Sequence, residues 1–139
     1  MRAQARGRWV TAAVKSMLQS NRQGAIILRD HGASSCTDVT GFGLLGHLAE
    51  MVRGCEQPTA VKLLMDSIPV LPGAAECVAQ GVFSSLQPAN LRLKRAVSNE
   101  AQAAAHPLWP LLFDPQTAGG LLSSVPAEKA DDCIKALKK

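Results

Sequence analysis

The chain has 139 residues, of which 47% are hydrophobic and 19% are charged, which is typical of one domain with a sizeable core. Two Trp, three Phe and no Tyr offer few aromatic faces, and much of the net charge of +4 lies near the termini, so nucleic-acid binding is not expected. The sequence has no secretory h-region and no apolar run of about 18 residues, which predicts a soluble, cytoplasmic protein with no membrane partner.

An amphipathic helix is predicted over residues 7–20. Apolar residues from Val10 to Leu18 recur at i, i+3, i+4, i+7 and i+8, as they do along one side of a helix. Trp9 is expected to anchor one edge of this helix. Because an isolated helix cannot bury such a stripe, we expect it to pack on a sheet or on other helices.

A second helix is predicted over 22–31, and a short strand over 34–39 follows it. The strand ends near Asp38, and a threonine and a glycine-rich turn lead directly into an apolar helix, predicted over 41–53. Cys36 is expected to be a small core residue of the strand.

The junction between this strand and the helix has the composition of a phosphate and metal site. With Thr40 as N-cap, its hydroxyl can accept from an early N–H group of the helix. A helix N-terminus attracts anions, and a carboxylate beside it, such as Asp38, can hold Mg²⁺ that bridges to phosphate oxygens. The alternative is that Asp38 only forms a turn and that Gly41, Gly43 and Gly46 only allow tight helix packing. Residue spacing leaves the two interpretations equally open.

His47 lies on the more polar side of the same helix, together with Glu50. We expect a surface histidine paired with Glu50, and a metal ligand is the less favoured alternative. The cysteines form no C-x-x-C pair, so no zinc site is predicted and reduced thiols are expected.

The second half of the chain predicts two further strands and two clear helices. Alternating apolar residues predict a half-buried strand over 59–65, and another strand is predicted over 120–125. Helices are predicted over 73–80 and 126–138, whereas 84–99 fits neither period cleanly. A three-stranded sheet with this much apolar helix looks incomplete.

A second informative stretch, FDPQTAGGLL, occupies residues 113–122. Its Asp114-Pro115 pair starts a turn, and Gly119-Gly120 allow unusual backbone angles before the last strand. The favoured interpretation is a structural turn against a neighbouring strand.

Two stretches resemble the signatures of one enzyme family. TDVTGFGLLGHL over residues 37–48 is similar to the first signature of the selenophosphate synthetases (selenide, water dikinases), and DPQTAGGLL over 114–122 is similar to the second. IPVLPG over 68–73 fits the segment between them. The resemblance spans roughly residues 7–138, with 84–106 divergent.

The resemblance implies that residues 1–139 are a single partial domain, the C-terminal domain of such an enzyme, whose N-terminal ATP-binding domain is absent. The implied fold is α+β, of the type found in the C-terminal domain of aminoimidazole ribonucleotide synthetase. Helices cover a mixed β-sheet that is partly ferredoxin-like and truncated at both edges. Unpaired edges recruit other chains, which predicts a homodimer.

The family makes monoselenophosphate from ATP, selenide and water, releases AMP and phosphate, and requires Mg²⁺. The resemblance therefore implies Asp38 as a magnesium ligand and places Thr40, Gly41 and Gly43 near the ATP phosphates.

The family's catalytic cysteine or selenocysteine lies in the N-terminal domain, so no catalytic residue is expected in this chain. The residues that do not correspond to it are Cys36, Cys55, Cys77 and Cys133. The chain is therefore expected to be an inactive fragment when isolated. The alternative function is a non-enzymatic binding or oligomerisation module of the same fold.

Overall fold

The computed structural model of the chain describes residues 5–138. The α-helices are α1 (Gly7–Met17), α2 (Arg22–Asp30), α3 (Gly43–Arg53), α4 (Ala74–Ala79), α5 (Gln87–Asn90), α6 (Glu100–Ala103) and α7 (Ala127–Leu137). The remaining elements are the strands β1 (Ser35–Asp38) and β2 (Leu121–Ser124) and the 3₁₀ helices η1 (Met65–Ser67), η2 (Leu91–Ala96) and η3 (Trp109–Phe113). The expected α+β class is confirmed.

The helices predicted over 7–20, 22–31, 41–53, 73–80 and 126–138 are confirmed as α1, α2, α3, α4 and α7. Their ends differ from the prediction by up to three residues, mostly in the terminal turns, where helices fray. The ambiguous segment forms the short helix α5 and then η2, which explains why no single period fitted it.

β1 and β2 pair antiparallel, with Ser35 opposite Ser124 and Asp38 opposite Leu121. Within residues 5–138 the sheet has these two strands, so it is smaller than the expected mixed sheet of three strands. The strand predicted over 59–65 is wrong, because this segment is irregular and leads into η1. Alternating apolar residues do not make a strand unless another strand accepts its backbone hydrogen bonds, and the described residues provide none beside it.

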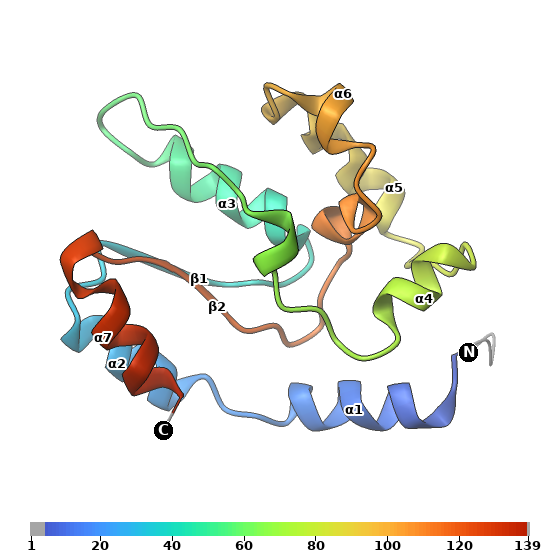
Figure 1. Cartoon of the computed structure of the whole chain (residues 1–139), viewed down its shortest axis with the longest axis horizontal. Helices are drawn as coiled ribbons and strands as arrows, with labels where there is room; N and C mark the ends of the chain where they lie inside the picture. The colour runs from blue at the N-terminus through green and yellow to red at the C-terminus, as the bar shows by residue number, and fades with distance from the viewer. Residues whose placement is uncertain (1–4, 139) are drawn as a thin grey trace.

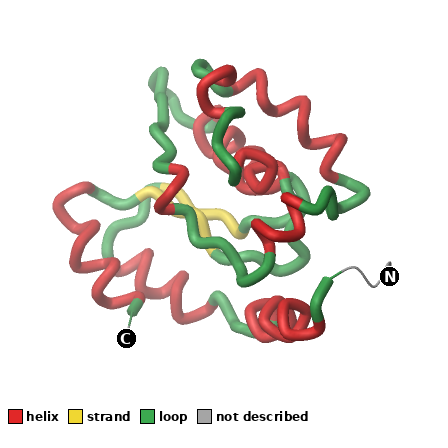
Figure 2. Tube along the Cα trace, turned by 45° about the vertical axis from the view of Figure 1, so that its right-hand side comes forward, coloured by secondary structure: helices red, strands yellow, loops and turns green. Residues whose placement is uncertain are grey.

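Helices lie on both sides of this small sheet (Figures 1 and 2). α2 and α7 lie side by side, and α2 also contacts β2. α3 lies on the other side of the sheet, where it packs against β1 and η3. The start of α3 is therefore next to the end of β1 and to the segment that follows η3.

The main hydrophobic core lies between α3 and η3. Leu45 of α3 packs with Leu112 and Phe113 of η3, and Phe113 is fully buried. Trp109 packs edge-on against Phe113, with the ring centroids 5.0 Å apart. This core holds the first turn of α3 against the residues that follow Phe113.

α1 lies along the edge of the molecule (Figure 1) and is anchored by Trp9, as predicted. The Trp9 ring covers Gly73, where any added Cβ would overlap the ring, and the Arg6 guanidinium lies 5.1 Å from the ring centroid. The expected burial of the α1 stripe is wrong for most of its length. Val10 and Val14 are 48% and 43% exposed, since no described element covers that side of the helix.

Candidate functional site

The two signature stretches meet at the start of α3, in what we call the signature junction (residues 38–43 and 113–120). The Thr40 carbonyl accepts from the N–H groups of Gly43 at 3.0 Å and of Gln116 at 3.1 Å. The Val39 N–H donates to the Gly120 carbonyl at 2.9 Å. Two stretches that are far apart in the sequence therefore form one backbone-bonded unit.

Asn90 of α5 connects both sides of the signature junction. Its side chain is buried, and Nδ2 donates to the carbonyls of Gly41 at 2.9 Å and Phe113 at 3.1 Å. Gln87, also buried, donates from Nε2 to the Pro110 carbonyl at 2.7 Å. Sequence analysis missed both residues because their segment seemed divergent. The available signal was a pair of amides spaced three residues apart, which places them on one side of a helix.

Thr40 does not cap α3, contrary to the prediction. The N-cap position is Phe42, which makes no side-chain cap hydrogen bond, and the Thr40 hydroxyl lies 3.2 Å from His47 Nε2 instead. His47 Nδ1 lies 3.2 Å from the Glu50 carboxylate, which confirms the predicted pair. The predicted surface position of His47 is wrong, because its residue exposure is only 7% and the Phe42 ring lies 5.5 Å away, centroid to centroid.

Gly43 is required by packing at the signature junction. Its φ is +70°, and a Cβ on it would lie 2.9 Å from the Phe113 carbonyl carbon and 3.1 Å from the Asp114 carbonyl oxygen. Gly41 differs, since a Cβ there would meet nothing within 4 Å. The packing interpretation is thus supported for Gly43, whereas the chain is open beside Gly41.

Two further glycines allow close contacts. A Cβ on Gly46 would lie 2.6 Å from Phe42 Cβ, so Gly46 lets Phe42 fold back over the first turn of α3. A Cβ on Gly119 would overlap the Val39 carbonyl oxygen. This close approach matches the predicted turn against a neighbouring strand.

Asp38 is the last residue of β1, and its side chain is exposed. Cys36 lies two residues earlier on the same face of the strand and is also exposed, so its expected core position is wrong. The alternation of the strand places Thr37 and Ser35 on the more buried face instead.

The described residues provide few side chains that could coordinate a magnesium ion. Within residues 5–138, no three His, Cys, Asp or Glu side chains lie together as a complete protein-built metal site requires. Mg²⁺ usually keeps several waters and binds one or two carboxylates plus substrate phosphates. The exposed Asp38 carboxylate can serve as one such ligand. The described residues can therefore contribute a ligand to a magnesium site but do not form a complete one.

Residues 114–116 are irregular and the chain bends at residues 117 and 118, so the bend lies after Asp114 and not at it as predicted. Gln116 Nε2 donates to Asp114 Oδ2 at 2.9 Å and to the Asp114 carbonyl at 3.2 Å. Burial raises the pKa of the Asp114 carboxyl above its usual value of 3.8, and the hydrogen bond from Gln116 partly offsets this by lowering it. The Asp114 carboxylate is thus engaged with Gln116 in the segment that follows η3.

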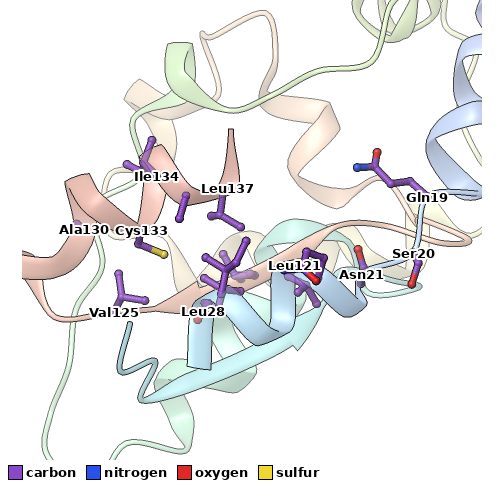
Figure 3. Close-up of a pocket in the computed structure, with 16 residues that line it drawn as sticks. Gln19, Ser20, Asn21, Leu28, Leu121, Val125, Ala130, Cys133, Ile134 and Leu137 are labelled. Carbon is purple, nitrogen blue, oxygen red and sulfur yellow. The ribbon is translucent and has the colours of Figure 1, made fainter. Parts of the chain in front are cut away.

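A groove runs between α2, α7 and β2, on the side of the sheet opposite α3 (Figure 3). Its apolar walls include Leu28, Leu121, Ile134 and Leu137, and polar side chains gather at one end, where Asn21 Nδ2 also donates to the Gly119 carbonyl at 3.0 Å. Among residues 5–138, the lining contains no Asp, Glu, His, Lys or Arg. This groove therefore suits packing and not phosphate chemistry.

Comparison with known proteins decides the family. Residues 10–139 match the family described as AIR synthase related protein, C-terminal domain. The chain belongs to this family. The match covers the signature junction and both layers of helices, so the whole fold described above is that of this C-terminal domain family.

Members of this family that resemble the chain include several selenide, water dikinases. The chain is 36% identical over 127 residues to the one from Pelobacter propionicus, covering 90% of this chain and 35% of the relative. It is 38% identical over 128 residues to the one from Caldanaerobacter subterraneus subsp. tengcongensis, covering 91% and 36%. For the Clostridioides difficile protein the identity is 31% over 128 residues, covering 90% and 35%. The resemblance stated from the two signatures is confirmed, and the chain spans about a third of the length of these relatives.

No helix in the described part of the chain is both long enough and apolar enough to span a membrane.

Proposed function

We propose that this chain acts as the C-terminal part of a selenide, water dikinase. The whole activity would form monoselenophosphate from ATP, selenide and water and release AMP and phosphate. The observation that carries the proposal is the signature junction, where both stretches that resemble the dikinase signatures meet beside Asp38. The identity to selenide, water dikinases along about 90% of the chain supports the same assignment.

In this proposal Asp38 holds Mg²⁺ at a phosphate site shared with a domain outside these residues. Its exposed carboxylate is available for that role, whereas the Asp114 carboxylate already accepts from Gln116. Magnesium would neutralise charge on the phosphates, because phosphoryl transfer depends mainly on positioning and charge compensation.

Thr40, Gly41 and Gly43 are proposed to lie near the ATP phosphates, with different tasks. The open space beside Gly41 allows close approach of a ligand to the backbone. Gly43 uses its N–H for the Thr40 carbonyl and its positive φ for the turn, so it shapes this approach and does not contact the phosphates. No residue of this chain is proposed to react covalently.

The unpaired sheet edges support a homodimer. β1 and β2 pair only with each other among the described residues, so each strand has an outer edge with free backbone groups. We propose that two chains associate along such an edge, in the cytoplasm, where four free cysteines are stable as thiols. A monomeric mass in light scattering at high concentration would argue against this association.

A chimera tests the proposed function directly. Residues 10–139 replace the matching third of the Pelobacter propionicus enzyme, and AMP formation is followed with and without selenide. We expect selenide-dependent AMP from the chimera and none from the isolated chain above a heat-inactivated control. A chimera that unfolds at the same temperature as its parent but forms no AMP would contradict the proposal and favour a non-enzymatic module. AMP formation by the pure isolated chain would contradict the need for a second domain.

A further inference from the structure

Three side chains lie in series from the surface to the signature junction, joined by an ion-pair contact and a hydrogen bond. Glu50 is exposed on α3, and its carboxylate lies 3.2 Å from Nδ1 of the buried His47. On the other side of the ring, His47 Nε2 lies 3.2 Å from the hydroxyl of Thr40, which is two residues after Asp38. Both ring nitrogens of His47 therefore have a protein partner.

The chemistry of these partners fixes the position of each proton. The ionised carboxylate of Glu50 lies 3.2 Å from Nδ1 and favours the neutral tautomer with its N–H on Nδ1, because that tautomer places the ring proton beside the negative charge. Nε2 then has only a lone pair and must accept from the Thr40 hydroxyl. The Thr40 oxygen consequently turns its proton toward His47 and keeps its lone pairs for a different partner.

The packing around His47 holds this arrangement in place. The Phe42 ring covers the imidazole at a tilt of 39°, and Gly46 allows Phe42 to approach α3 this closely. The Thr40 carbonyl is held by the N–H groups of Gly43 and Gln116, which fixes the backbone that carries the hydroxyl. A buried ring with a partner at each nitrogen can orient a neighbouring hydroxyl with little loss of freedom on ligand binding.

We propose that His47 is a positioning residue that orients the Thr40 hydroxyl, so that Thr40 Oγ1 presents an acceptor oxygen to the ligand site. An oxygen oriented in this way suits a cation or its bound water, whereas a phosphate oxygen needs a donor. The inference rests on the proposed function, and it assigns Thr40 to the cation side of the site. Glu50 supports the orientation by fixing the tautomer of His47.

The tautomer is measurable without any ligand. In the 139-residue chain labelled with ¹⁵N-histidine, long-range ¹H–¹⁵N spectra distinguish protonated from unprotonated ring nitrogens, and His47→Gln identifies the His47 signals. His106 is an internal reference of opposite type, since the Leu108 N–H donates to its Nδ1 at 3.1 Å and its Nε2 faces Asp66 at 3.1 Å. We expect the N–H of His47 on Nδ1 and that of His106 on Nε2. A His47 ring protonated on Nε2 at neutral pH would overturn the inference.

Activity of the chimera then tests whether the orientation matters. We expect His47→Leu and Thr40→Val each to lower kcat/KM about 10- to 100-fold and to raise the Mg²⁺ concentration needed for half-maximal rate, as for other residues that orient metal ligands. His47→Gln places an amide oxygen near the position of Nε2 and is expected to restore most of the activity. The double variant is expected to be no worse than either single one, because both remove the same interaction. Glu128→Gln, at an exposed carboxylate on α7, is the control and is expected to match the wild type.

The outcomes separate this inference from the proposed function. If Asp38→Asn inactivates the chimera while Thr40→Val and His47→Leu leave its rate and Mg²⁺ response unchanged, the positioning role is wrong and the proposed function stands. If Asp38→Asn has no effect, the magnesium role of Asp38 fails, while selenide-dependent AMP formation by the chimera still supports the assignment to a dikinase. If His47→Leu unfolds the chimera, the activity of Thr40→Val and the tautomer of His47 still test the positioning role.

Discussion

The signature junction differs from two outlying segments, α1 and residues 59–65, in where their packing partners lie. In the junction, backbone and side-chain groups are bonded within the chain, as in the bonds from Asn90 to Gly41 and Phe113. In the two outlying segments apolar side chains remain uncovered: Val10 of α1 is 48% exposed, and Val61 and Leu64 are 51% and 59% exposed. Residues that resemble an active-site signature thus mostly build the fold, while residues that follow a core pattern remain on the surface.

The largest loss of stability is expected from removing Trp9, which anchors α1. Trp9→Ala should lower the free energy of unfolding by about 3–5 kcal/mol, the usual cost of removing a buried tryptophan side chain. Val14→Ser on the exposed side of the same helix should change it by less than about 0.5 kcal/mol. Urea denaturation measures both. Equal losses for the two variants would show that the exposed side of α1 is covered in solution.

A pair of glycines tests the packing of the junction. Gly43→Ala must place a Cβ at positive φ and against the Phe113 backbone, with an expected cost of about 2–4 kcal/mol. Gly41→Ala meets no atom within 4 Å and is the matched control, with a small effect on stability. Thermal and urea unfolding of both variants provide the comparison, and a Gly43→Ala chain as stable as Gly41→Ala would refute the packing argument.

A substitution of Asn90 tests whether its hydrogen bonds from α5 stabilise the signature junction. Asn90→Ala leaves the carbonyls of Gly41 and Phe113 without this donor and should cost about 1–3 kcal/mol. Asn99→Ala removes an exposed amide that bonds only Gln102 among the described residues and should cost less than about 0.5 kcal/mol. Similar values for the two amides would mean that Asn90 is not a structural link.

The smallest effect is a pH dependence at Asp114. Its pKa is raised in the folded protein by burial, so the folded state binds this proton more tightly than the unfolded state. The contribution of Asp114 to stability is therefore greatest below its usual pKa of 3.8 and declines as pH rises through the raised value. Asp114→Asn should remove that decline, which is measured as the difference between wild-type and variant urea midpoints across the acid range. A difference that grows in the opposite direction would contradict the burial of this carboxyl.

The elements predicted from sequence were those whose pattern depends on local geometry. Periodicity predicted α1, α2, α3, α4 and α7, and turn residues predicted the close approach at Gly119. The strand over 59–65 failed because a strand depends on a partner that local pattern does not reveal. The predicted burial of the apolar stripe of α1 failed for the same reason, because burial also depends on a packing partner.

The candidate site was predicted in its residues but not in its connections. The His47–Glu50 pair followed from spacing, whereas the magnesium role of Asp38 stays a prediction. The role of Asn90, the burial of His47 and the bond from its Nε2 to Thr40 depend on contacts between segments, which spacing alone does not reveal. From the sequence, the glycines at the start of α3 suited a ligand and close packing equally well. The structure distinguishes them, because a Cβ on Gly43 would meet the backbone of residues 112–114 whereas a Cβ on Gly41 would meet nothing within 4 Å.

The central claim is that Asp38 holds magnesium while the Asp114 carboxylate is engaged with Gln116. The most direct test compares Asp38→Asn and Asp114→Asn in the chimera, with AMP formation measured over a range of Mg²⁺ concentrations down to limiting values. The account predicts a large loss of turnover for Asp38→Asn with an unchanged unfolding temperature, since an amide keeps the size but not the charge that Mg²⁺ requires. For Asp114→Asn it predicts an unchanged Mg²⁺ response, because that carboxylate is engaged with Gln116. An Asp38→Asn chimera as active as the wild type at limiting Mg²⁺ would contradict the account and leave Asp38 as an exposed residue at the end of β1 without a metal role.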